Sequence, residues 1–123
     1  MNRSNELVIS GRLAERDALR HTPAGVALVN FRIVHASERL EAGAERQVYA
    51  DIACVAAEEV ARLLAAAPLG AMVRATGFLA GKGSPGGSAG GGTGVRSGRQ
   101  LVLHVTEIEF EEGQSDGNVR QTA

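Results

Sequence analysis

A strand pattern changes into a helix pattern within residues 48–68, VYADIACVAAEEVARLLAAAP. In residues 48–54, apolar residues alternate with polar or small ones, which is the period of a half-buried strand. Residues 56–67 have two acids near their start, continue with good helix formers that place their large apolar side chains on one face, and are followed by Pro68. This order predicts one short amphipathic helix directly after a strand.

Four further segments alternate apolar and polar residues and are expected to be strands. Two of them precede residues 48–68 and two follow. Gly11 and Gly77 lie inside two of these segments, where a residue without a side chain lets a sheet curl. The alternation slips by one residue at Thr106-Glu107, which predicts a β-bulge. The four strands are expected over residues 7–13, 27–34, 72–79 and 100–110.

The remaining segments are interpreted as loops and a tail. Residues 16–25 contain the turn sequence Thr-Pro-Ala-Gly, and the charged residues 37–46 are interpreted as a connection between two strands. Residues 81–99 contain nine glycines and Val95 as their one large apolar residue, which predicts a mobile loop. Residues 111–123 have no periodicity and are predicted to be a disordered tail.

Three strands, a helix and two more strands are the element order of an oligonucleotide-binding (OB) fold. We therefore predict an all-β domain with one short helix, built as a five-stranded antiparallel OB-fold barrel over residues 1–110. A chain of 123 residues suits one such domain. A five-stranded sandwich, or an open antiparallel sheet with a packed helix, has the same element order and stays open at this point.

Composition excludes several classes of protein. Cys54 is the single cysteine, so no disulfide can form within the chain, and a thiolate metal site is not expected. The longest uncharged apolar stretch, residues 63–73, is about half of what a membrane span requires, and the first residues lack a signal-peptide core. We expect a soluble, cytoplasmic protein without a membrane association.

No group of residues has the pattern of a catalytic or cofactor site. His21, His35 and His104 are far apart in the sequence, which disfavours a metal site, and no base can be assigned to any serine or to Cys54. Residues 81–86, GKGSPG, fit the letters of a dinucleotide fingerprint, but the glycines and proline that follow prevent the helix which that site needs. We predict no enzyme activity, no catalytic residues, no metal and no cofactor.

Positive charge is gathered in one part of a chain whose formal net charge is -1. Residues 82–100 carry Lys82, Arg96 and Arg99 and no acid, whereas residues 101–123 hold five acids and one arginine. A basic loop beside a sheet face suits a single-stranded polyanion, because each neutralised phosphate releases counterions. The same three charges could also serve only to keep a glycine tract soluble.

Tyr49 lies on the strand phase opposite the core residues, and we expect it to share a face with Arg32. A ring and a guanidinium on one sheet face can stack a base and hold its phosphate. A tyrosine half-covered by a neighbouring loop would have the same sequence pattern.

Several short motifs, in order along residues 5–110, resemble the primosomal replication protein N (PriB) family of bacterial replication-restart factors. This family is in turn similar to bacterial single-stranded DNA-binding proteins. The motifs are NELVISG (5–11), TPAG (22–25), NFRIVH (30–35), EAG (41–43), RQVY (46–49) and LVLHV (101–105).

The resemblance implies an OB-fold homodimer that binds single-stranded DNA and bridges the restart helicase PriA to later primosomal loading factors, without catalysis of its own. Because a curled sheet leaves strand edges unpaired, we expect twofold pairing through the first strand. The family positions and the basic loop give six expected DNA-binding residues, Arg20, Arg46, Tyr49, Lys82, Arg96 and Arg99. Arg32 is a seventh, because it is expected to share a sheet face with Tyr49.

Two departures from the family bear on DNA affinity: Ala44 occupies a position that can hold an aromatic residue, and glycines dilute the lysine-rich loop. One alternative function is a single-stranded DNA-binding protein paralogue, which the ending NVRQTA (118–123) disfavours because those proteins carry an acidic, aromatic-tipped tail. The other is a primosome adaptor that binds mainly proteins and has weak DNA affinity.

Overall fold

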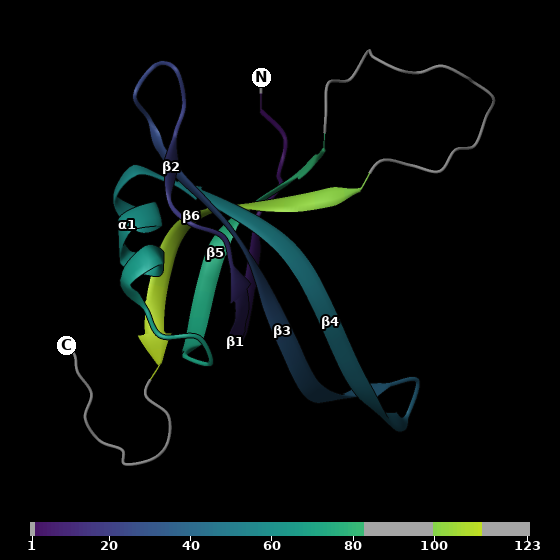
Figure 1. The fold of residues 1–123 in the computed structure, drawn as a ribbon. Helices are drawn as coiled ribbons and strands as arrows, with labels where there is room; N and C mark the ends of the chain where they lie inside the picture. The colour runs from purple at the N-terminus through teal and green to yellow at the C-terminus, as the bar shows by residue number, and fades with distance from the viewer. Residues whose placement is uncertain (1, 83–99, 112–123) are drawn as a thin grey trace.

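The computed structural model describes residues 2–82 and 100–111 (Figure 1). Most of the predicted loop and the tail after Glu111 lie outside these residues. The described residues form six strands and one helix, in the order β1 Leu7–Arg16, β2 Arg20–His21, β3 Ala27–Glu41, β4 Ala44–Ala57, α1 Glu58–Ala66, β5 Met72–Gly81 and β6 Leu101–Glu111.

Five of the strands close into a barrel. The sheet order is β1-β5-β6-β4-β3, and β1 also pairs with β3, which completes the circle. The predicted five-stranded OB-fold barrel is therefore confirmed. One pairing differs from the expected antiparallel arrangement, because β4 and β6 run parallel where Cys54 meets Leu103. Local alternation does not encode the relative direction of two strands whose paired residues, Cys54 and Leu103, are 49 residues apart in sequence.

The barrel interior is filled by the residues that the alternation placed on the inner phase. These side chains lose nearly all contact with water, and each contributes about 1.5–3 kcal/mol through the hydrophobic effect. Helix α1 packs against β3, β4 and β6 with Ala61 and Leu64 buried, so it covers the core at one end. The largest fully buried side chains are Leu13, Ile33, Leu64, Leu103, Val29, Val73 and Cys54.

The predicted bulge in the last strand is confirmed. Thr76 pairs with Glu107 and Gly77 pairs with Val105, so Thr106 is the extra residue on β6. A Cβ atom at Gly77 would collide with the carbonyl oxygen of His104. Only glycine lets the two strands approach at this bend.

The interpretation of residues 37–46 as a connection is wrong. Strands β3 and β4 pair without interruption out to Glu41 and Ala44, and the turn between them consists of Ala42 and Gly43 alone. Both turn residues have positive φ, 53° and 81°, as a type I′ hairpin requires. Beyond Val34, where β3 leaves β1, this hairpin extends away from the barrel (Figure 1). We call residues 35–50 the arm. Its charged residues lie on both faces, which removed the alternation that marks a strand.

The expected loop at residues 16–25 also contains structure. Strand β1 continues to Arg16, and the short β2 pairs with Ala27 and Leu28 at the start of β3. The predicted Thr-Pro-Ala-Gly turn forms between them, with the Gly25 N–H donating to the Thr22 carbonyl at 2.8 Å.

Helix α1 is stabilised at its C-terminal end by a side chain from β1. Its last turn contains no basic residue, but Arg16 Nη1 donates hydrogen bonds to the carbonyls of Leu64, at 3.1 Å, and Ala67. A cation at this end satisfies free carbonyls and opposes the negative end of the helix dipole. Within the described part of the chain, no helix has the length and apolar character needed to cross a membrane.

Candidate nucleic-acid interface

An open cleft of about 470 Å³ lies where the end of β1, the short β2 and the end of β5 meet the outer side of β3 and β4. Three of the predicted binding residues, Arg20, Arg32 and Lys82, line it although they are separated by up to 62 residues in sequence. We call it the rim cleft. It is lined by Glu15, Arg16, Asp17, Arg20, Asn30, Phe31, Arg32, Ala53, Cys54 and Lys82.

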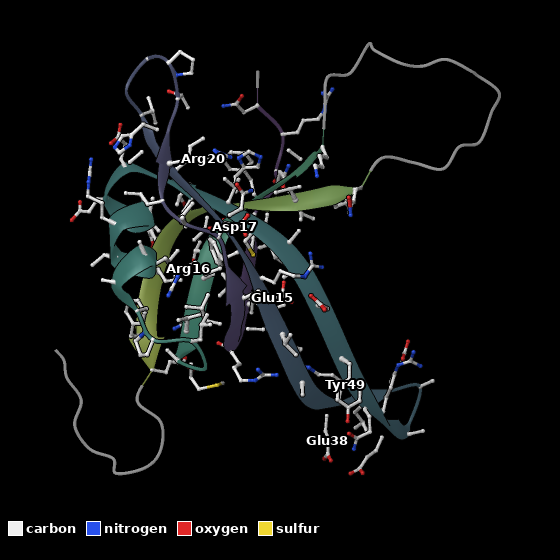
Figure 2. All side chains as sticks on the ribbon, in the orientation of Figure 1. Glu15, Arg16, Asp17, Arg20, Glu38 and Tyr49 are labelled. Carbon is white, nitrogen blue, oxygen red and sulfur yellow. The ribbon has the colours of Figure 1, made fainter. Side chains whose placement is uncertain are left out.

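The guanidinium groups of the rim cleft are held in place by oxygen acceptors. Arg20 Nη2 donates to Asn30 Oδ1 at 2.7 Å, which orients the side chain and leaves its charge unneutralised. Arg32 Nε lies 2.7 Å from Asp51 Oδ1, so Arg32 is already paired with a carboxylate. Figure 2 shows Arg20 on β2 and Asp17 in the segment between β1 and β2. The cleft is therefore positive but not strongly so.

Lys82 connects the rim cleft to the predicted basic loop. Its backbone N–H donates to the Gln100 carbonyl at 2.8 Å, so the two ends of the intervening segment are joined at the cleft. The predicted binding residues Arg96 and Arg99 belong to that segment and lie outside the described residues.

The register places Tyr49 and Arg32 on the same outer face of the β3–β4 hairpin. Arg32 pairs with Ala53, and Tyr49 lies four residues from Ala53 along β4, which is about 14 Å in a strand. Tyr49 is 72% exposed and lies on the arm (Figure 2). The Tyr49 ring is therefore not half-covered by a neighbouring loop. It lies on the same outer face as the rim cleft, farther along the hairpin.

Arg46 lies on the opposite face of the arm from Tyr49, because the two are an odd number of residues apart on one strand. It forms an ion pair with Glu41 at 3.4 Å and sits directly opposite Arg39. The arm therefore divides the predicted residues between its two faces, and one strand of nucleic acid on the outer face would contact Tyr49 but not Arg46.

Arg39 was missed in the sequence analysis. Two like charges opposite each other in an antiparallel pair repel and destabilise the hairpin, which makes Arg39 and Arg46 a second place where an anion would be favoured. The signal that could have found this pair is the Gly43 turn, since centring a hairpin there sets Arg39 against Arg46.

Cys54 lies beneath the rim cleft as a neutral thiol. It is 1% exposed, and burial raises its pKa to about 12, although the positive charge of Arg32 and a backbone hydrogen bond from Ile33 act in the opposite direction. A thiol with this pKa is protonated near neutral pH, so it is neither an activated nucleophile nor a metal ligand.

The histidines are apart in space as well as in sequence. His35 joins the arm to β1, with Nδ1–H donating to the Ser10 carbonyl at 2.7 Å and Nε2 lying 2.8 Å from Ser37 Oγ. Across residues 2–82 and 100–111, no three histidine, cysteine or acidic side chains are grouped as metal ligands would be.

Residues 5–107 match the model of a family described as "another single-strand binding protein family". The chain is 46% identical over 76 residues to replication restart protein PriB of Bordetella pertussis, which covers 62% of this chain and 71% of that protein. It is 32% identical over 106 residues to PriB of Nitrosomonas europaea, covering 86% of this chain and 87% of that protein.

Two solved structures are similar to the whole barrel. PriB from Ralstonia solanacearum superimposes with a TM-score of 0.71 at 29% identity, covering 89% of this chain and 100% of that chain. A deletion mutant of the single-stranded DNA binding protein from Thermus aquaticus gives a TM-score of 0.66 at 17% identity, covering 90% of this chain and 52% of that chain. The second similarity concerns the fold alone.

Proposed function

We propose that this protein binds single-stranded DNA without catalysis, in the cytoplasm, as part of replication restart. The chain belongs to the single-strand binding protein family and, within it, to the replication restart protein PriB family. The DNA would lie over the rim cleft and along the outer face of β3 and β4.

The convergence of Arg20, Arg32 and Lys82 on one cleft is the observation that carries this proposal. Cations from three separate elements suit a flexible anionic backbone, and the exposed Tyr49 ring on the same face suits an unstacked base. Arg96 and Arg99 would add phosphate contacts from the segment that starts and ends at the cleft, and Arg46 would act from the other face of the arm.

The test is a titration of labelled oligodeoxythymidine at several salt concentrations. Wild-type protein should bind less tightly as salt rises, because phosphate contacts release counterions. The double variant Arg20→Ala with Lys82→Ala should bind more weakly, and its slope of log K against log salt should be smaller by about 1.4, or 0.7 for each lost contact.

Arg62→Ala on α1 is the control for loss of a positive charge away from the cleft, because Arg62 is exposed and pairs only with Glu58 of the same helix among the ion pairs of the described residues. It should leave both affinity and slope unchanged. A wild-type affinity that does not depend on salt, or equal slopes in all three proteins, would refute contact through these phosphate-binding side chains.

We also propose that the bound protein bridges the restart helicase PriA to later loading factors. The specific alternative is an adaptor that binds mainly proteins, which is favoured by the ion pairs of Arg32 and Arg46 and by the net charge of -1. To separate the DNA-binding protein from the adaptor, we would measure both the DNA affinity of the wild-type protein and its stimulation of the helicase. Stimulation without detectable DNA binding would favour the adaptor.

A homodimer through β1 completes the proposal. Leu7 to Gly11 pair with β5 on one side, while pairing of β1 with β3 begins only at Arg12. Among the described residues, the other edge of Leu7 to Ile9 has no strand partner, whereas Ser10 already accepts from His35, and a second copy of β1 would pair with this free edge. Sedimentation should show a dimer at micromolar concentration, and a monomer there would contradict this pairing.

A further inference from the structure

An aromatic pair outside the predicted site lies on the outer surface of β5 and β6. The rings of Phe78 and His104 are stacked, with centroids 5.0 Å apart and an angle of 4° between their planes. The two residues are direct partners in the β5–β6 register, and Phe78 is 41% exposed. Both are absent from the residues that line the rim cleft.

The stack is continuous with the proposed DNA-binding face through the strand register. His104 is the partner of Val55 on β4, and Val55 is the partner of Asn30 on β3. Asn30 in turn accepts the hydrogen bond from Arg20. Measured around the curved outer surface of the barrel, Phe78 and Asn30 are three strand spacings apart, which is about 14 Å.

A second connection runs along β5. Lys82 comes four residues after Phe78, directly after the end of β5 at Gly81, and Ala80 between them has the same phase as Phe78. The cross-strand partner of Ala80 is Val102, so the surface between the ring pair and Lys82 carries only small or apolar side chains.

We propose that the Phe78–His104 stack is a nucleobase subsite that extends the single-stranded DNA path from the rim cleft across β4 and β6 onto β5. This inference rests on the proposed function. The Phe78 side chain offers no hydrogen bond, so it holds a base by stacking and apolar contact, without preference for one base. Arg20 and Lys82, which both line the rim cleft, would neutralise phosphates at the point where the path leaves the cleft.

The chain contains no tryptophan, so Phe78→Trp introduces a single tryptophan at the subsite, which can be excited at wavelengths that Tyr49 does not absorb, and keeps an aromatic ring there. Addition of oligodeoxythymidine at low salt should quench its emission with the same midpoint as binding measured by anisotropy. Leu63→Trp, at an exposed position on α1, is the control and should show no quenching.

The second variant is Phe78→Leu, which removes the ring but no charge. It should weaken oligonucleotide binding about 5- to 100-fold while leaving the salt slope at the wild-type value. Met72→Leu, at an exposed position on the same strand, should bind as wild type does. Thermal unfolding of each variant shows whether the barrel is retained.

The outcomes separate this inference from the function on which it rests. Wild-type binding with no quenching at position 78 and no loss in Phe78→Leu overturns the subsite alone. Emission that changes with protein concentration and not with oligonucleotide means that a second copy covers the stack, which also overturns the subsite. Absence of wild-type binding overturns the proposed function together with the subsite.

Discussion

At Arg32, the positive charge expected to meet a phosphate already has a carboxylate partner. The pair with Asp51 is exposed to water on both sides, so it adds less than about 1 kcal/mol to stability. Asp51→Asn should release the guanidinium and remove a negative charge from the DNA-binding face. We predict binding of single-stranded DNA that is about 2- to 5-fold tighter at low salt, measured by fluorescence anisotropy.

Glu58→Gln is the control for Asp51→Asn, because Glu58 pairs with Arg62 on α1 and its loss changes the net charge equally. It should not alter affinity. Weaker binding by Asp51→Asn would show that Asp51 positions Arg32 for DNA and does not compete with it.

The buried thiol of Cys54 gives a pH dependence with a definite sign. Its folded pKa of about 12 lies above the ordinary value of 9.0, so the folded state holds the proton more tightly. This contribution to stability is complete below the ordinary pKa and is lost as pH rises from there toward 12, by about 1.4 kcal/mol per pH unit. Urea unfolding from pH 8 to 10.5 should show a steeper loss in wild type than in Cys54→Ala, and parallel losses would contradict burial of the thiol.

Among the elements, α1 depends on a side chain that belongs to another element. Arg16→Ala leaves the carbonyls of Leu64 and Ala67 without that donor, so we expect a loss of about 1–3 kcal/mol in the free energy of unfolding. Arg12→Ala, an exposed position on the same strand, should cost less than about 0.5 kcal/mol. Equal losses in urea unfolding would mean that Arg16 does not cap the helix.

The arm contains a correctable strain in its turn. Ala42 has a φ of 53°, a conformation that costs an L-residue with a Cβ about 1 kcal/mol and that asparagine tolerates better. Ala42→Asn should slow amide hydrogen exchange in the arm about 2- to 5-fold, and Ala42→Val should accelerate it. No difference between the two variants would contradict a type I′ turn in solution.

The elements that bury one face could be predicted from the sequence, and those that do not were mispredicted. Residues 27–34 alternate because Val29, Phe31 and Ile33 fill the barrel. The arm has water on both faces, so no alternation marks it, and β2 is too short to have a period. The parallel contact of β4 with β6 depends on closure of the barrel and has no local signal.

At the scale of the whole molecule, the candidate site forms only because the strands close into a barrel. The sequence indicated Arg20, Arg32 and Lys82 separately, but their meeting in one cleft depends on how β2, β3 and β5 are arranged in the barrel. The ion pair between Arg32 and Asp51 could not be predicted from the sequence either, since the two residues are 19 positions apart. The stack of Phe78 on His104 joins positions 26 residues apart across the bulge at Thr106.

A map of backbone amide chemical-shift changes on titration with oligodeoxythymidine tests the central claim most directly, because it reports every strand of the barrel in one experiment. We predict that the changes concentrate at Arg20, Arg32, Tyr49 and Lys82, with α1 unaffected. Changes that concentrate on α1, or that spread evenly over the barrel, would contradict a DNA-binding face formed by the rim cleft and the outer side of β3 and β4.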